Sequence, residues 1–164
     1  MILRLMLELP EDLAYTRITR VLGRALLEHL QVEPRDVDDV ETLVGELCSN
    51  VLRHAQSTSG RFQVVLEYHN DVVIIMVKDQ GEGFSFQDVP PAGTSRADFG
   101  GGERLGGFGM QLIYGLSDHL AFHRTDPHGT TVRAEKKLHY RSEHAASAAA
   151  ELNRSEGHAR ITMD

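Results

Sequence analysis

Residues 46–54, with the sequence ELCSNVLRH, decide how the rest of the chain is interpreted. At about 100° per residue on a helix, Glu46, Asn50, Arg53 and His54 fall within an arc of about 100° and form one polar strip. The apolar residues of the same helix occupy the neighbouring arc: Val37, Val40, Leu43, Val44, Leu47, Cys48 and Val51. The strip therefore follows the rim of a buried face. Because burying a polar group without a partner costs about 2–7 kcal/mol, we expect a polar partner here, an anion with a metal ion.

The composition is that of one ordinary globular domain. The 164 residues are 41% hydrophobic and 25% charged, which allows one substantial core. No apolar run approaches the roughly 20 residues that span a bilayer, and the start lacks a signal-peptide pattern, so we expect a cytoplasmic protein without a membrane partner. The net charge of −7 argues against direct binding to nucleic acid. Cys48 is the only cysteine, which excludes an internal disulfide and predicts a buried thiol.

The first third of the chain predicts a strand and two helices. Residues 2–9 alternate or run apolar and end at Pro10, as in a strand closed by a turn. Asp12 can cap a helix over about residues 12–31, and Pro34 begins a second helix that carries the polar strip and ends near Ala55. The apolar residues of the first helix, expected to pack in the core, are Leu13, Ile18, Val21, Leu22, Ala25, Leu26 and Leu30. Its arginines, expected to form a solvated face, are Arg17, Arg20 and Arg24.

A hairpin is predicted next. Residues 62–68 alternate between apolar and polar side chains, as in a half-buried strand. Asn70-Asp71 is a turn signal, and the β-branched run 72–77 predicts a central strand. This strand leads directly into the sequence KDQGEGF at 78–84, so an aspartate and two glycines are expected where the strand ends.

The rest of the chain predicts a loop, a helix, a second strand pair and a tail. Residues 85–105 have no clear periodicity and are interpreted as a functional lid or a disordered segment. Residues 105–116 open with glycines and continue as an apolar helical pattern. Residues 120–125 and 130–138 predict an antiparallel pair, and residues 139–164, rich in Ala and His, are expected to be flexible.

Three motifs are ambiguous singly and informative together. Glu46 with Asn50 fits surface residues, the sequence DQGEG at 79–83 fits an ordinary turn, and the glycines at 106–109 fit a loop before a helix. Their order, however, fits a bound nucleotide. Glycines at a helix start let backbone N–H groups approach a phosphate. An aspartate at a strand end can accept a hydrogen bond from the adenine amine, and an asparagine offers an oxygen to Mg²⁺.

The order of these motifs resembles the N, G1 and G2 boxes of the GHKL ATP-binding superfamily. The form E-L-x-x-N-x-x-R-H-A at 46–55 and the sequence GTTV at 129–132 are similar to the bacterial anti-sigma factor serine/threonine kinases. The resemblance implies a kinase domain over residues 1–138 that binds ATP and Mg²⁺. It also implies the Bergerat fold, an α/β (α+β) two-layer sandwich in which helices cover one face of a mixed, mostly antiparallel sheet.

The resemblance also implies a role for each matching residue. Glu46 matches the proposed general base, Asn50 the ligand of Mg²⁺, and Asp79 the partner of the adenine amine. Gly81 and Gly83 would shape the adenine pocket, and Gly107 and Gly109 would cradle phosphates. The other positions implied to bind the nucleotide are Arg53, His54, Gly81, Gly83, Arg104, Gly106, Gly107, Phe108, Gly109 and Thr130.

The family resemblance implies a function and leaves two alternatives open. The implied function is an ATP-binding anti-sigma factor and protein serine/threonine kinase that phosphorylates an anti-sigma factor antagonist of the STAS type. Its implied partners are a sigma factor, that antagonist and a second copy in a homodimer. The alternatives are a non-catalytic ATP-binding module that sequesters a partner, and the stand-alone catalytic domain of a histidine kinase.

Overall fold

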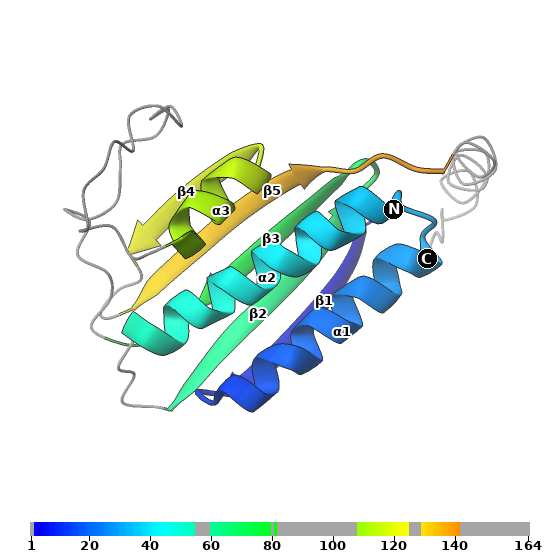
Figure 1. Ribbon diagram of the computed structural model, residues 1–164. Helices are drawn as coiled ribbons and strands as arrows, with labels where there is room; N and C mark the ends of the chain where they lie inside the picture. Colours follow the sequence, from blue (N-terminus) through cyan, green and yellow to red (C-terminus); the bar gives the residue numbers. More distant parts are fainter. Residues whose placement is uncertain (1, 55–59, 80, 82–107, 125–128, 142–164) are drawn as a thin grey trace, which may run out of the picture.

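The computed structural model describes residues 2–54, 60–79, 81, 108–124 and 129–141 (Figure 1). The elements, in chain order, are β1 Ile2–Pro10, α1 Leu13–His29, α2 Pro34–His54, β2 Arg61–His69, β3 Val72–Lys78, α3 Phe108–Leu116, β4 His119–Arg124 and β5 Thr130–Lys137. Each matches a helix or strand predicted from the sequence. The predicted lid at 85–105 lies outside the described residues. In the described part of the chain, no helix is long and apolar enough to cross a membrane.

The five strands form one antiparallel sheet in the order β1-β2-β3-β5-β4. The predicted hairpin is present: Val65 lies opposite Met76 where β2 pairs with β3. Helices α1, α2 and α3 all lie on one face of this sheet (Figure 1). The predicted two-layer sandwich, with helices on one face, is therefore confirmed.

The core lies between α2 and the sheet. All seven apolar residues of α2 named above are buried, and the cysteine among them, Cys48, is fully buried as predicted. Burial raises the pKa of the Cys48 thiol to about 12, because the charged thiolate is disfavoured away from water. On the sheet side, β3 buries Val73, Ile75 and Val77, because alternate residues of a strand share one face.

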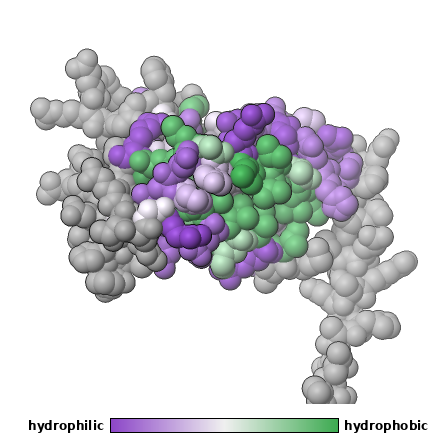
Figure 2. Space-filling view, turned by 90° about the horizontal axis from the view of Figure 1, so that it is seen from below, coloured by the Kyte–Doolittle hydropathy of each residue, from purple (hydrophilic) through white to green (hydrophobic). Residues whose placement is uncertain are grey.

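Helix α1 differs from its prediction. Its buried residues are Thr19, Gly23 and Leu27. Small residues let α1 approach the sheet closely: a Cβ added at Gly23 would lie 3.3 Å from Leu66 Cδ1. The apolar residues predicted for the core that are exposed instead are Leu13, Ile18, Val21, Leu22 and Ala25. They contribute to a hydrophobic patch on the side of the molecule that carries α1 (Figure 2).

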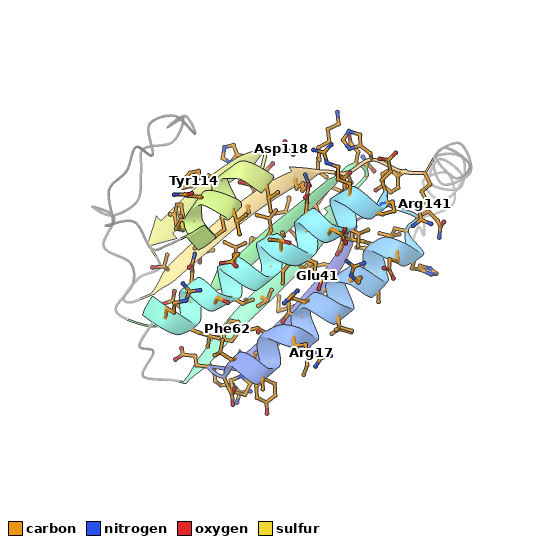
Figure 3. All side chains as sticks on the ribbon, viewed as in Figure 1. Arg17, Glu41, Phe62, Tyr114, Asp118 and Arg141 are labelled. Carbon is orange, nitrogen blue, oxygen red and sulfur yellow. The ribbon has the colours of Figure 1, made fainter. Side chains whose placement is uncertain are left out.

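Two of the arginines expected to be solvated instead join α1 to α2. Arg24 Nε lies 2.6 Å from Glu41 Oε2, and Arg20 Nη2 lies 2.9 Å from Glu41 Oε1. Arg24 also pairs with Asp38. Glu41 lies between the two helices, whereas Arg17 points away from α2 (Figure 3). Arg17 is therefore solvated as predicted, whereas Arg20 and Arg24 remain partly exposed but pair with acidic residues of α2 that lie opposite them.

Residues 138–141, which follow β5, contact the start of α2. His139 N–H donates to Asp36 Oδ2 at 2.6 Å, and Asp36 is buried. Tyr140 forms a bridge with Val32, and Arg141 N–H donates to Gln31 O. These contacts continue three residues past the predicted domain end at 138, and the rest of the predicted tail lies outside the described residues.

Candidate functional site

The predicted motifs meet at one end of the molecule. The last turns of α2, the end of β3, the start of β5 and the start of α3 all lie at the left in Figure 1. Antiparallel pairing explains part of this, because β3 ends beside the start of β5, where Lys78 lies opposite Thr131. Helix α2 crosses the same sheet face and carries its polar strip to this end. The fold therefore brings together segments that are about 80 residues apart in the sequence.

Asp79 is buried where β3 ends. Its backbone N–H donates to Thr130 O at 3.0 Å, which fixes it beside the start of β5. Its side-chain Oδ1 accepts a hydrogen bond from Gly81 N–H at 2.9 Å. Its second oxygen, Oδ2, is buried and has no hydrogen-bond partner among the described residues. A buried carboxylate oxygen without a donor is costly, so Asp79 is suited to accept a hydrogen bond from a bound molecule.

Glu46 and Asn50 lie against the first turn of α3. A Cβ added at Gly109 would overlap Glu46 Oε2 and would lie 3.9 Å from Asn50 Oδ1. Asn50 Nδ2 lies 3.2 Å from Met110 Sδ, so its amide hydrogens point to the sulfur and its oxygen remains for another partner. Gly109 is thus required by the close approach of α2. The same absence of a side chain leaves the helix start open to a ligand.

The buried polar side chains are concentrated at this end. The buried polar or charged residues of the described chain are Thr19, Asp36, Asn50, Asp79 and Thr130. Three of them, Asn50, Asp79 and Thr130, belong to the predicted site. Burial of polar groups in one place is expensive for folding alone, so it indicates a binding site.

Not every predicted residue can be placed. Arg53 is exposed in the last turn of α2. The side chains of His54 and Phe108 are not described, and Gly83, Arg104, Gly106 and Gly107 lie outside the described residues. Among the described residues, no group of three or more His, Cys, Asp or Glu side chains could hold a metal ion by itself.

Met110 is a site residue that the sequence prediction missed. Its sulfur holds the Asn50 amide in one orientation, although a methionine in an apolar helical pattern normally indicates only core packing. Its position directly after Gly109 was the one available signal. Only the packing of α3 against α2 shows the contact.

The chain is similar to a family of known domains and to curated kinases. The family model of the histidine kinase-like ATPase domain matches residues 9–136. A serine-protein kinase RsbW of Staphylococcus epidermidis is 25% identical over 140 residues, which cover 80% of this chain and 85% of that protein. The RsbW of Halalkalibacterium halodurans is 26% identical over 116 residues, covering 68% and 70%. These relatives support the predicted enzyme class, an ATP-dependent protein serine/threonine kinase.

Two solved structures have the same fold. The SiaB–SiaC complex of Pseudomonas aeruginosa matches with a TM-score of 0.66 at 18% identity, covering 80% of this chain and 88% of the other. The RsbU and RsbW domains of a Mycobacterium tuberculosis protein match with a TM-score of 0.61 at 16% identity, covering 83% of this chain and 32% of the other. The chain thus spans about a third of that larger protein. Because the family model matches most of its length and the N-box and G1 residues occupy one site, the chain belongs to the histidine kinase-like ATPase domain family.

Proposed function

We propose that this protein is an ATP- and Mg²⁺-dependent protein serine/threonine kinase that also acts as an anti-sigma factor. The observation that carries the proposal is the buried Oδ2 of Asp79 at the end of β3, which has no hydrogen-bond partner in the part of the chain that the structure describes. The names of the curated relatives, serine-protein kinase, support the reaction class.

Asp79 selects adenine. Its Oδ1 is occupied by the Gly81 N–H, so Oδ2 accepts the hydrogen bond of the exocyclic amine. Hydrogen bonds to charged groups contribute about 1.5–3 kcal/mol. Guanine carries a carbonyl at the corresponding ring position, and two acceptors facing each other would disfavour it.

Asn50 and Gly109 hold the phosphate end. Asn50 Oδ1 serves as a ligand of Mg²⁺, a cation that prefers oxygen ligands and supplies charge neutralisation at the phosphates. Gly109 leaves the first backbone N–H groups of α3 accessible to an anion, which the positive end of the helix dipole also favours. Further proposed nucleotide contacts are those of Arg53, His54, Gly81, Gly83, Arg104, Gly106, Gly107, Phe108 and Thr130.

Glu46 is the proposed general base. Its carboxylate lies against Gly109, beside the helix start at which the phosphates would lie. There it can accept the proton of a serine or threonine hydroxyl that attacks the γ-phosphorus of ATP, while ADP leaves. General-base catalysis contributes about 10²–10⁴-fold to a rate. Alignment and charge neutralisation provide the remainder of phosphoryl-transfer catalysis.

The proposed partners are those of a partner-switching pathway in the cytoplasm. The protein forms a homodimer, binds a sigma factor, and phosphorylates an antagonist of the STAS type. A partner exchange of this kind requires different affinities in different nucleotide states. The solved structure of SiaB with SiaC shows that a protein of this fold forms a complex with a partner protein.

Transfer of labelled phosphate tests the reaction. The purified protein, Mg²⁺ and γ-labelled ATP are incubated with a STAS-domain antagonist from the same genome, and acid-stable label on serine or threonine is measured. We expect Glu46→Gln to reduce the rate by about 10²–10⁴-fold. The matched control is Glu33→Gln, which changes an exposed glutamate just before α2 and leaves the rate unchanged. No transfer by the native protein, or full transfer by Glu46→Gln, contradicts the assignment.

The same assay separates the two alternatives. Acid-labile label on histidine would indicate a histidine kinase domain. A sequestering module would bind ATP and the partner but transfer no phosphate, and it would release the partner equally well with a non-hydrolysable ATP analogue.

Asp79→Asn tests the adenine contact. The asparagine Oδ1 can keep the Gly81 hydrogen bond, but its amide group places hydrogens where Oδ2 lay. We expect ATP affinity to fall about 10- to 100-fold, whereas affinity for purine riboside triphosphate, which lacks the amine, changes little. Calorimetry measures both, and Asp71→Asn in the exposed β2–β3 turn is the control. If Asp79→Asn lowered the affinity for both nucleotides equally, the proposed hydrogen bond from the adenine amine to Asp79 would be contradicted.

A further inference from the structure

The Met110 side chain in the first turn of α3 contacts the polar strip of α2. Asn50 Nδ2–H donates to Met110 Sδ at 3.2 Å. Asn50 is only 5% exposed, and Met110 is partly buried and packs against the core. α3 lies beside α2 on the sheet, which brings together two side chains that are 60 residues apart in the sequence (Figure 1). The contact therefore depends on how these two helices pack.

The chemistry of the two groups favours one orientation of the Asn50 carboxamide. The amide nitrogen carries two hydrogens and only donates, whereas the amide oxygen only accepts. A thioether sulfur is a weak acceptor and has no hydrogen to donate. If the carboxamide were turned over, its oxygen would lie against the sulfur, and two acceptors would face each other without a hydrogen between them. Met110 therefore distinguishes between the two orientations that fit the same space.

The favoured orientation also fixes Asn50 Oδ1. The nitrogen and oxygen lie at opposite ends of a carboxamide, so an amide nitrogen held at the sulfur determines where the oxygen lies. A Cβ added at Gly109 would be 3.9 Å from this oxygen, which places Oδ1 near the start of α3. Mg²⁺ takes oxygen ligands, and amide hydrogens facing the cation would repel it. The contact with Met110 thus decides which end of Asn50 a cation would meet.

Packing and orientation are separable at position 110. The inner side of α3 continues with aliphatic residues, Ile113 fully buried and Leu116 partly buried. A leucine at position 110 would fill a similar volume, because Leu and Met exchange readily in a core. It would, however, leave the Asn50 amide hydrogens without their sulfur acceptor. The sulfur atom, rather than the apolar volume, is what a leucine cannot replace.

We propose that Met110 is a positioning residue for the magnesium ligand Asn50. Its sulfur holds the amide hydrogens, so that Oδ1 faces the cation before the cation binds. The inference rests on the proposed function, because Asn50 is a ligand of Mg²⁺ only if the site binds ATP with Mg²⁺. It adds that the affinity for Mg²⁺ depends on the packing of α3 against α2.

Met110→Leu tests the role of the sulfur. Calorimetry measures the affinity for ATP in EDTA and over a series of Mg²⁺ concentrations. We expect the Mg²⁺ concentration that gives half of the gain in ATP affinity to rise about three- to tenfold, because one hydrogen bond holds the orientation. We expect the affinity for ATP in EDTA to change less than about twofold. Equal losses with and without Mg²⁺ would show a packing role only and would overturn the proposal.

Met6→Leu is the matched control. Met6 on β1 also accepts an amide N–H, that of Gln63 Nε2 at 3.5 Å, but it is 51% exposed and lies outside the candidate site. The control therefore makes the same substitution and removes the same kind of contact elsewhere in the chain. The Mg²⁺ dependence should stay at the native value. If Met6→Leu shifted it as far as Met110→Leu does, the positioning role would be overturned.

Asn50→Asp tests whether the effect passes through the carboxamide. An aspartate has an oxygen at both ends, so it offers an oxygen to a cation in either orientation. In this background Met110→Leu should cause no further loss in the response to Mg²⁺. The two substitutions are then non-additive, as expected for residues that act through one contact. A second loss of about three- to tenfold in the Asn50→Asp background would overturn the proposal.

Nuclear magnetic resonance of the nucleotide-free protein tests the orientation without a metal. Nuclear Overhauser effects should connect the side-chain amide hydrogens of Asn50 with the terminal methyl group of Met110. Their absence from the native protein would overturn the proposal.

The measurements separate this inference from the proposed function. A native protein whose ATP affinity does not respond to Mg²⁺ would contradict the proposed role of Asn50 and, with it, the positioning role of Met110. A native protein that responds to Mg²⁺, together with an unchanged response in Met110→Leu, would contradict the positioning role alone.

Discussion

Helices α1 and α2 lie side by side on the same face of the sheet but distribute their residues in opposite ways. α2 buries its whole apolar arc and carries Glu46 and Asn50 to the start of α3. α1 buries small residues, leaves Ile18, Val21 and Leu22 exposed, and pairs two arginines with Glu41 of α2. The difference follows from position, because α2 lies over the middle of the sheet and α1 over its edge. Apolar periodicity therefore identifies a helix but does not say what covers its apolar side.

The largest expected effect on stability distinguishes the buried apolar side of α2 from the exposed apolar side of α1. Leu43 of α2 is fully buried, so Leu43→Ala leaves a cavity and is expected to lower the free energy of unfolding by about 3 kcal/mol. Leu22 of α1 is 39% exposed, so Leu22→Ala should cost less than about 1 kcal/mol. Urea unfolding of the native protein and of the two variants measures both losses. If both substitutions lowered the free energy of unfolding equally, the proposed difference between α1 and α2 would be contradicted.

The second effect concerns the polar strip of α2. In Gly109→Ala the new methyl group overlaps the end of the Glu46 side chain, which can move away, so the fold should be retained. The displaced carboxylate should reduce phosphate transfer by at least about tenfold, or about 1.4 kcal/mol. Gly115→Ala is the control on the same helix, because a Cβ there meets nothing within 4 Å. If both variants transfer phosphate at the native rate, Glu46 does not need its observed position.

The smallest expected effect concerns the Arg24–Glu41 ion pair between α1 and α2. The Arg24 side chain, hydrogen bonded to Glu41, holds the pKa of Glu41 below its ordinary value of 4.5. Glu41→Gln should lower the free energy of unfolding by about 1 kcal/mol at pH 7, a small value because the pair is partly exposed.

The pH dependence of this pair has a definite sign. A carboxylate whose pKa is lowered by folding stabilises the protein above its unfolded pKa, and this stabilisation is lost as pH falls through the folded pKa. The difference between native protein and Glu41→Gln should therefore shrink below about pH 4.5. Unfolding of both proteins from pH 7 to pH 3 measures it, with Glu33→Gln as an exposed control. A difference that persists at pH 3 would show that packing, rather than charge, is responsible.

Much of the fold was predictable because local patterns specify it. Alternation identified β2, a β-branched run identified β3, and Asp12 capped α1 as expected, its carboxylate accepting the Ala14 N–H at 2.9 Å. For the site, the predicted positions of Glu46, Asn50, Asp79 and Gly109 meet at one end of the sheet. Met110 and the Arg20–Glu41 and Arg24–Glu41 pairs were not predictable, because each depends on which residue of another element lies opposite.

The sequence alone determined the elements, their order and the family, because hydrophobic periodicity, turn residues and short motifs are properties of neighbouring residues. The tertiary structure alone decided which side chains lack partners among the described residues: Asp79 Oδ2 inside the site, and the exposed apolar residues on one side of α1. The physical reason is that burial and hydrogen bonding are relations between segments distant in the chain. Burial and hydrogen bonding between these segments are therefore not apparent from the sequence and arise only when the sheet is assembled.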